Sequence, residues 1–469
     1  MSAKVQNSPI AALCVAASLA LAGHAGTAGT AGQALAQSAS DPLPAYVVEQ
    51  FGEPPAVPTG DYAPDVFLAA EAAFFESMIQ QSWGPDQEIA VGVIEESGDP
   101  RLVWLLTDLL RFVGDVNLED RIARASSTLL GKDVTGRDAW GTITDHMIAW
   151  DIPEPPGYLR YKRQIFMTFI PGWDQIFVEG DIDWRHVSWG GVLIDNRPFG
   201  AEQLCRNCIP AADNPAVSSA EQATWLRDDD IIFGITLNGE SRAYPRQIME
   251  VREMVNDTLG GRDLGIPYCT LCGAMQAYFT DDVPEGVERP VLRTSGLLSR
   301  SNKVMFDVNS YSVFDTFLGH AVTGPLAEIG VQLNQAPVVT TTWGQWKAAH
   351  PDTTVLIEEL ALGRNFDFRA GRDAQGPIFP VGDVDPRLGV QEDVIGVLNA
   401  DGQAIAFPRG RAFLALDRGE PIEVEGVRLV LDAGGIRAVD AASGQDLGSH
   451  QAFWFAWSQF HPNTLLWPL

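Results

Sequence analysis

Two cysteine pairs with the same short spacing are the residues in this sequence best suited to chemistry. Cys205 and Cys208 form one pair, Cys269 and Cys272 form the other, and Gly273 follows the second pair directly. A two-residue gap brings both sulfurs to one side of a tight turn, and a glycine after it allows a positive φ that turns backbone N–H groups toward the thiolates. This is the sequence form of a metal knuckle, with all four cysteines as candidate ligands for zinc or copper.

The same spacing is compatible with two other kinds of chemistry. In a thiol-redox site Cys269 would be the catalytic nucleophile and Cys272 its partner, by analogy with motifs whose first cysteine is the more exposed. The strand-like stretch 274–280 favours a knuckle, because a thioredoxin-type site needs a helix N-terminus to lower the thiol pKa. Disulfides are the third alternative, and the four cysteines leave three pairings open.

A second catalytic candidate consists of two carboxylates just upstream of Cys269. Glu253 and Asp257 are four residues apart in a stretch that we expect to be helical. They would then share one helix face and form a paired-carboxylate site. A structural ion network that includes Arg242 and Asp307 is the competing interpretation.

The remaining candidates for a ligand or a catalytic group are weaker. His320 and His461 are the best placed to supply a third metal ligand, and Met305 could complete a soft copper(I) site. A packed or surface role is the commoner fate of an isolated histidine or methionine. Arg206 is the only cation beside a cysteine pair. The sequence has no H-E-x-x-H, Walker A or G-x-G-x-x-G motif, so zinc-protease and nucleotide-binding roles have no support.

The elements that must position these residues change type along the chain. Apolar residues recur at helical spacing over 61–185, as in Leu102 to Val113, which predicts a HEAT-like stack of short helices. From about 186 the pattern becomes β-rich. The segment 231–245, with Asn238-Gly239 between two apolar runs, predicts a β-hairpin.

An echo of this hairpin follows at 394–409. Both copies end in Ala-aromatic-Pro-Arg, with a turn dipeptide at the same offset. The echo indicates an internal duplication of a β unit, and two unrelated hairpins are the alternative. If the duplication is real, only the first copy leads into a cysteine pair.

The C-terminal region carries an aromatic run, Phe453-Trp454-Phe455-Ala456-Trp457. A buried strand with both faces covered is our interpretation. An aromatic platform in a binding pocket is the alternative.

From about 189 onward the chain resembles a bacterial family known as domain of unknown function 3179. The segments that carry the resemblance include 189–192, 209–215, 253–257, 267–273 and 453–457. The resemblance implies no established activity. It implies that the pair at Cys269 and Cys272 is typical of the family, whereas the pair at Cys205 and Cys208 departs from the common pattern.

The N-terminus and the charge restrict where the protein works and what it contacts. Residues 1–36 have one lysine, a short apolar run and an A-x-A site, which predicts a cleaved signal peptide and a periplasmic or secreted protein. Residues 37–60 are predicted to be a linker. The net charge of -29 argues against nucleic-acid binding. No later run is long and apolar enough to span a membrane.

These features together predict an α+β protein with an α-helical part at 61–185 and a larger β-rich domain at 186–469. We expect an exported, soluble protein with a metal-binding or thiol-redox site at Cys269 and Cys272, acting on a small molecule or an exported protein partner. The alternative is a non-catalytic binding module in which the cysteines form structural disulfides.

Overall fold

The computed structural model describes residues 42–59, 84–201, 205–357 and 375–468. The predicted signal peptide lies outside these residues, as do the first predicted helical residues at 61–83. Part of the predicted linker is helical. Residues Ala45–Phe51 form helix α1, because Val47 and Phe51 have an apolar core to pack against.

Five longer helices follow in the described residues 84–169 of the part predicted to be helical. Capping side chains define their starts: Asp99 accepts an N–H from Arg101 ahead of α5, and Asp115 accepts N–H groups at the start of α6. Gly131, at a φ of 63°, ends α6. The predicted apolar stripes are buried. The helices are α4 (Pro85–Ser97), α5 (Val103–Leu110), α6 (Val116–Leu130), α7 (Ala139–Ala149) and α8 (Tyr158–Phe169).

The described strands form five small sheets, mostly antiparallel, so the predicted α+β class is confirmed. The first sheet contains β1 (Val187–Trp189), β10 (Leu292–Ser299), β11 (Asn302–Asp307) and β12 (Val313–Phe314). The second contains β13 (Gln335–Ala336), β9 (Ala277–Phe279), β7 (Arg262–Cys269), β6 (Met254–Leu259) and β2 (Ala212–Asp213), with β8 (Ala274–Met275) paired to β7.

The other sheets are built around the predicted hairpins. The third contains β14 (Val339–Thr342), β4 (Ile231–Leu237), β5 (Glu240–Pro245), β15 (Thr354–Leu356) and β3 (Val217–Ser219). The fourth contains β21 (Ser449–Phe453), β16 (Asp393–Leu398), β17 (Ala404–Pro408) and β22 (Leu465–Leu466). The fifth contains β18 (Ile422–Val424), β19 (Val427–Asp432) and β20 (Gly435–Asp440).

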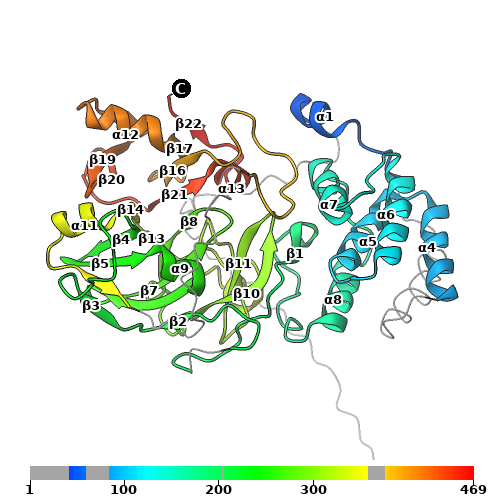
Figure 1. Cartoon of the computed structure of the whole chain (residues 1–469), viewed down its shortest axis with the longest axis horizontal. Helices are drawn as coiled ribbons and strands as arrows, with labels where there is room; N and C mark the ends of the chain where they lie inside the picture. Colours follow the sequence, from blue (N-terminus) through cyan, green and yellow to red (C-terminus); the bar gives the residue numbers. More distant parts are fainter. Residues whose placement is uncertain (1–41, 60–83, 202–204, 358–374, 469) are drawn as a thin grey trace, which may run out of the picture. The chain divides into compact units, whose positions relative to one another are not determined.

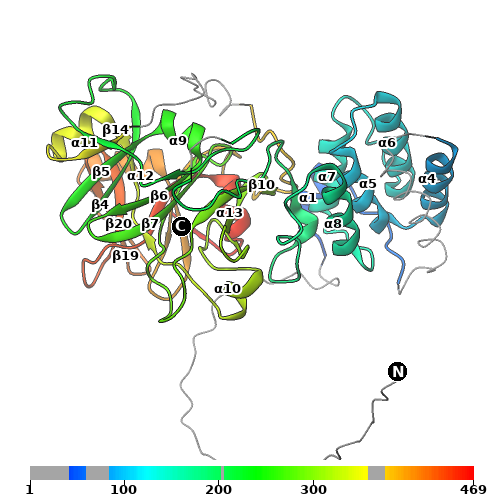
Figure 2. The same cartoon turned by 90° about the horizontal axis from the view of Figure 1, so that it is seen from below.

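The helical segment and the first sheet share one apolar core. Residues of α4–α8 lie in the same cluster as Leu297, Val304 and Phe306 of β10 and β11. The Trp173 indole also donates a hydrogen bond to the carbonyl of Ser295, at 2.8 Å. Figures 1 and 2 show β10 beside the helices in both views. None of the helices in the described residues is long and apolar enough to cross a membrane.

The two hairpins predicted from the sequence echo belong to units with the same strand order. We define the first unit as β14-β4-β5-β15 and the second as β21-β16-β17-β22. In each unit one outer strand runs antiparallel to the first hairpin strand. The other outer strand runs parallel to the second hairpin strand. Helices α9 (Arg246–Arg252) and α12 (Arg409–Asp417) follow the hairpins, and α11 (Trp343–Ala349) and α13 (Trp454–Phe460) follow the antiparallel outer strands.

Matching side chains occupy matching places in the two units. Trp346 donates a hydrogen bond from Nε1 to Thr353 at 2.9 Å, and Trp457 donates one to Thr464, also at 2.9 Å. Gly234 and Gly396 each lie under the corresponding tryptophan ring, where a Cβ atom would collide with it. This shared order and packing is what an internal duplication predicts.

The aromatic run at 453–457 is buried as expected, but most of it is not a strand. Phe453 ends β21, and α13 begins at Trp454. The helix forms because Trp454 and Trp457 are three residues apart and so lie on one helix face, which the second unit covers.

Candidate functional site

The cysteine pair predicted to form a knuckle lies in the turn between β7 and β8. Cys269 pairs with Ala274 across this hairpin, and Gly273 has a φ of 62°, so the predicted turn geometry is confirmed. Cys269 and Cys272 are joined by a disulfide bond. They are 2% and 0% exposed and belong to an apolar cluster that includes Trp454 and Trp457. The sulfurs are therefore shielded from solvent.

A tight turn of β10 and β11 contacts this disulfide. The carbonyl oxygen of Ser301 lies 3.9 Å from Cys269 Sγ and 3.6 Å from Cys272 Sγ. Arg300 and Ser301 have φ values of 45° and 69°, a conformation that costs energy in residues with a Cβ atom. The Ser301 hydroxyl and Asn302 Oδ1 are buried without a hydrogen-bond partner in the part of the chain that the structure describes.

Glu253 reaches the cysteine turn from another direction. Its carboxylate accepts hydrogen bonds from the Thr270 hydroxyl at 3.0 Å and from Lys303 Nζ at 2.5 Å. Lys303 also donates to the Thr294 hydroxyl, at 3.2 Å. Glu253 is thus a neighbour of the cysteine pair, although an ion pair with a buried lysine already engages it.

The predicted carboxylate pair does not form. Helix α9 ends at Arg252, Glu253 adopts a left-handed conformation, and Asp257 lies in β6, so the expected shared helix face was wrong. Asp257 accepts hydrogen bonds from Arg242 at 2.6 Å and from the Tyr244 hydroxyl at 2.8 Å. Burial, and then the Asp257 charge, raises the pKa of Tyr244 well above its usual value.

The ion network proposed as the alternative is present only in part. Arg242 and Asp257 form a largely buried ion pair, whereas Glu253 pairs with Lys303. Asp307 accepts hydrogen bonds from the backbone N–H of Val291 and from Ser310, and so stabilises a turn.

The other cysteine pair is also closed. Cys205 and Cys208 form a disulfide bond, and Asp195 lies close enough to share a metal ion with their sulfurs. The Asp195 carboxylate already accepts hydrogen bonds from Arg197 at 2.6 and 2.7 Å and from the Ala211 N–H at 2.9 Å. Among the described residues this is the only cluster of three potential ligands, so no third ligand joins Cys269 and Cys272.

The weaker candidates are dispersed. Met305 is a core residue, His320 lies 3.9 Å from Asp181, and Arg206 is exposed. His461 packs on Trp457, with ring centroids 4.0 Å apart, and burial lowers its pKa to about 3. Its Nε2 has no partner among the described residues.

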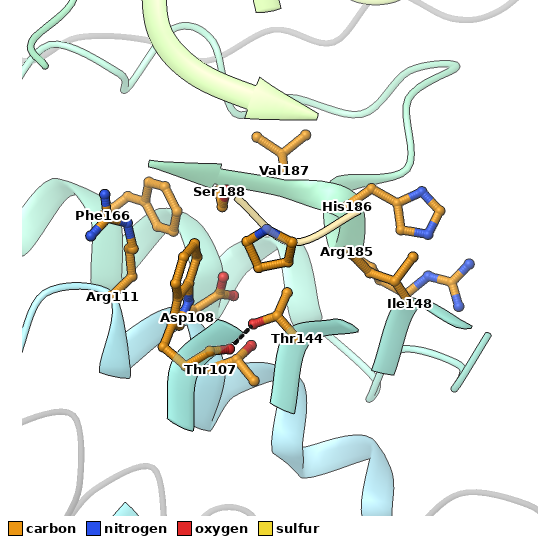
Figure 3. Close-up of a pocket in the computed structure, with 12 residues that line it drawn as sticks. Thr107, Asp108, Arg111, Thr144, Ile148, Phe166, Arg185, His186, Val187 and Ser188 are labelled. Carbon is orange, nitrogen blue, oxygen red and sulfur yellow. Dashed lines mark hydrogen bonds between the residues drawn. The ribbon is translucent and has the colours of Figure 1, made fainter. Parts of the chain in front are cut away.

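A cavity lies between the helices and β1, and its polar residues were missed by the sequence analysis. Its volume is about 10 Å³, and its lining comes from α5, α7, α8, β1 and the segment at Pro380. Figure 3 shows Arg111 and Phe166 on one side, Arg185 and His186 on the other, and Ser188 above. Burial lowers the pKa of His186 to about 4, so the imidazole is neutral at pH 7.

Behind this cavity is a buried polar triad. Lys162 donates hydrogen bonds to Asp108 at 2.5 Å and to the Tyr158 hydroxyl at 3.1 Å, and Tyr158 donates to Asp108 at 2.8 Å. Burial raises the pKa of Asp108 and lowers that of Lys162. A signal for this triad was available, because Lys162 follows Tyr158 by four residues and lies on the apolar face of α8.

The comparisons with known proteins locate one of the cysteine pairs in a family domain. A family model described as a protein of unknown function, DUF3179, matches residues 206–446. The match includes the turn at Cys269 and Cys272 and excludes the helices α1 to α8, Cys205 and the strands β21 and β22. No curated protein and no solved structure matches the chain.

Proposed function

The chain belongs to the DUF3179 family of proteins of unknown function. We propose that it is an exported binding module whose cysteine pairs are structural disulfides. The observation that carries the proposal is the closed and buried state of Cys269 and Cys272. Thiol exchange requires a thiolate to attack a sulfur that it can reach. A disulfide packed in one apolar cluster with Trp454 and Trp457 is instead suited to fix the shape of the β7–β8 turn where it packs on the second unit.

Hydrogen bonding around the pair supports the same role. The Phe453 N–H donates to the Cys272 carbonyl at 2.8 Å, which connects the end of β21 to the turn. Glu253, whose carboxylate accepts a hydrogen bond from Thr270 in the turn, forms an ion pair with Lys303. Neither contact provides the cation that would stabilise a reactive thiolate.

A metal-binding or thiol-redox site at Cys269 and Cys272 is the second candidate. The polar groups beside the sulfurs favour it, because the Ser301 hydroxyl and Asn302 Oδ1 are buried without partners. A reduced pair would offer two thiolate ligands, whereas zinc usually takes four ligands and copper(I) takes soft ones. Glu253 would then be the adjacent acid or base, and Asp257 would remain in its ion pair with Arg242.

One experiment separates the two candidates. The mature protein is purified from the exported fraction without reductant, and its free thiols are counted before and after denaturation alongside elemental analysis. The binding-module proposal predicts no free thiol and no bound metal. A zinc or copper ion bound at one per chain, or two thiols that appear on denaturation, would contradict it.

Two double variants show which pair matters. Cys269→Ser with Cys272→Ser removes the buried disulfide, and Cys205→Ser with Cys208→Ser is the control of the same spacing. A structural role predicts lower stability and unchanged ligand binding for the first variant. Mass spectrometry of the mature N-terminus tests export, and cleavage after Ala36 is the expected result.

A further inference from the structure

We propose that residues 379–385 form a pH-sensitive strap, which is closed in acid and looser above neutral pH, with Asp145 of α7 as the group that senses the proton. This goes beyond the proposed binding role and does not rest on it. Residues 375–392 contain no helix or strand. Such a long stretch without secondary structure is uncommon in a compact protein and is usually functional or disordered. This one makes specific contacts with several elements.

The backbone of the strap lies directly on α7. The N–H groups of Val381 and Gly382 both donate to Asp145 Oδ1, each at 2.8 Å. Gly382 has a φ of 70°, and a Cβ atom at this position would collide with the side chain of Ile148. The close approach thus places two strap N–H groups on one carboxylate oxygen.

Residues of the β-rich part and of α1 hold the strap as well. Arg300, in the turn between β10 and β11, donates from Nε to the Val381 carbonyl at 2.9 Å and forms an ion pair with Asp383 at 2.7 Å. Gln459 of α13 donates to the Val381 and Asp383 carbonyls at 2.8 and 3.0 Å. The Tyr46 hydroxyl of α1 donates to Asp383 Oδ2 at 3.0 Å. The strap therefore connects α1 and α7 to the first sheet and to α13.

The strap is also part of the layer that covers the buried disulfide. Val381 and Leu388 belong to the apolar cluster that contains Cys269 and Cys272. An open strap would remove Val381 from this layer. A pH response of the strap would thus act on the surroundings of the disulfide.

The two oxygens of Asp145 have different surroundings. Both strap N–H groups use Oδ1, whereas Oδ2 has no hydrogen-bond partner among the described residues. A proton on Oδ2 therefore leaves both hydrogen bonds to Oδ1 in place. Burial is the largest effect on the Asp145 pKa and raises it to about 6, although the two N–H groups oppose the rise. The closed strap thus disfavours the charge of Asp145 and not its contacts.

Protonation of Asp145 therefore favours the closed strap. In an open strap the carboxyl would be solvated, with the usual aspartate pKa of about 3.9. Between that value and about 6 the closed strap holds a proton that the open one has lost, so closing weakens as the pH rises through 6. With these values the closing equilibrium falls about tenfold between pH 5 and pH 8.

Several other ionisable side chains lie on the elements around Asp145. They are Asp138 and His146 on α7, Asp108 and Arg111 on α5, Lys132 after α6, Tyr46 on α1, Arg300 in the β10–β11 turn, Asp383 on the strap, and Arg185 and His186 ahead of β1. Burial, and then the Asp383 charge, raises the pKa of Tyr46 to about 12, and burial lowers that of His186 to about 4. Neither group changes its charge between pH 5 and pH 8.

Two of these neighbours are the competing sensors. Burial lowers the pKa of His146, so its protonation in acid would loosen the structure, which is the opposite sign. Burial raises the pKa of Asp108, which gives the same sign as Asp145. Asp108 accepts its hydrogen bonds from Lys162 and Tyr158, however, and not from the strap. A variant of Asp145 itself therefore distinguishes the sensors.

Hydrogen exchange with mass spectrometry on the intact, oxidised protein tests the proposal, with each rate divided by the intrinsic rate at that pH. Protection of the peptide that covers Val381 and Gly382 should fall about tenfold from pH 5 to pH 8. Asp145→Asn keeps an acceptor for both N–H groups and has no charge, so its protection should be equal at both pH values. Asp120→Asn, at an exposed position on α6, is the matched control and should keep the native slope.

Three results would overturn the proposal: protection that is constant with pH, protection that rises with pH, or a native slope in Asp145→Asn. Circular dichroism establishes whether each variant folds. If Asp145→Asn does not fold, Asp138→Asn decides, because asparagine still caps α7 and the Asp138 charge contributes to the raised pKa of Asp145. The midpoint of protection should then move to lower pH, and an unmoved midpoint counts against Asp145.

Discussion

The first and second units have the same strand order, yet only the tryptophan layer of the second unit includes a disulfide. In the first unit Trp343 and Trp346 pack with Ala223 and Leu226, from the loop that precedes β4. In the second unit Trp454 and Trp457 pack with the disulfide of Cys269 and Cys272, together with Phe317, Val381 and Leu388. Both layers thus include residues from the loop before the first hairpin strand, and the second layer also includes the disulfide and Phe317.

This difference changes the unit to which the pair Cys269 and Cys272 is assigned. Along the sequence the pair follows the first hairpin, which suggested a site that belongs to the first unit. In space it lies on the second unit, where the Phe453 N–H donates to the Cys272 carbonyl. The disulfide joins residues three apart and so constrains only the β7–β8 turn, and this turn is held on the second unit by apolar packing and by the Phe453 hydrogen bond.

The largest expected effect comes from replacing the matched tryptophans Trp346 and Trp457, which tests whether the two units are energetically equivalent. Trp346→Ala and Trp457→Ala should each lower the free energy of unfolding by about 3 to 5 kcal/mol, because each leaves a large cavity in a buried layer. Urea unfolding followed by circular dichroism measures both. A loss at one position that is several-fold smaller than at the other would show that the two layers are not equivalent in energy.

Each unit has a histidine directly after the helix that carries its tryptophans, His350 after α11 and His461 after α13, and the two should differ in how they make stability depend on pH. Burial holds the pKa of His461 at about 3, below the value of 6.5 for an unfolded chain. A depressed histidine pKa stabilises the fold above 6.5, and that contribution is lost as the pH falls toward 3. Linkage gives a loss of roughly 2 kcal/mol between pH 7 and pH 5 for such a group.

Thermal melts of His461→Gln over this pH range should therefore have a shallower pH slope. His350→Gln is the matched control, because the side chain of His350 is 22% exposed and lies 3.8 Å from Asp432. We attribute the pH slope that remains in His461→Gln to His450, because burial also lowers the pKa of His450 to about 3. An unchanged slope in His461→Gln would contradict this account.

The two disulfides provide the next comparison. Both close loops of the same length, so the chain-entropy contribution is about 2 kcal/mol for each. The serine double variants at Cys269 and Cys272 should lose more stability than those at Cys205 and Cys208, because only the first pair is fully packed in an apolar cluster. Equal losses in guanidinium unfolding would show that this packing adds nothing.

The sequence predicted local features well and long-range ones poorly. The hairpin at 231–245 and the turn after Cys272 depend on neighbouring residues, and the structure contains both. The carboxylate pair failed because the helix that was to carry Asp257 ends at Arg252.

The groups around the cavity could not be assembled from the sequence. Arg111 depends on Trp189 and Phe379, which are distant in sequence and belong to different segments. The two-residue gap of the cysteine pairs was compatible with a metal site, a thiol-redox site or disulfides, so the sequence did not decide among the three. The packing of the second unit over Cys269 and Cys272, and the hydrogen bonds around the turn, favour a structural role.

The smallest expected effect concerns the turns of the two hairpins, where the units differ in loop length. The first hairpin turns through Asn238 and Gly239, with φ values of 50° and 86°, in a two-residue loop. The second has a loop of residues 399–403, in which Gly402 has a φ of 79°. A Cβ atom at either glycine would meet no neighbour within 4 Å. Gly239→Ala and Gly402→Ala should thus each cost about 1 kcal/mol, from backbone strain alone. A larger loss at Gly239 in urea unfolding would indicate that the two-residue turn also fixes the register of β4 and β5, since the longer loop can relax and the short one cannot.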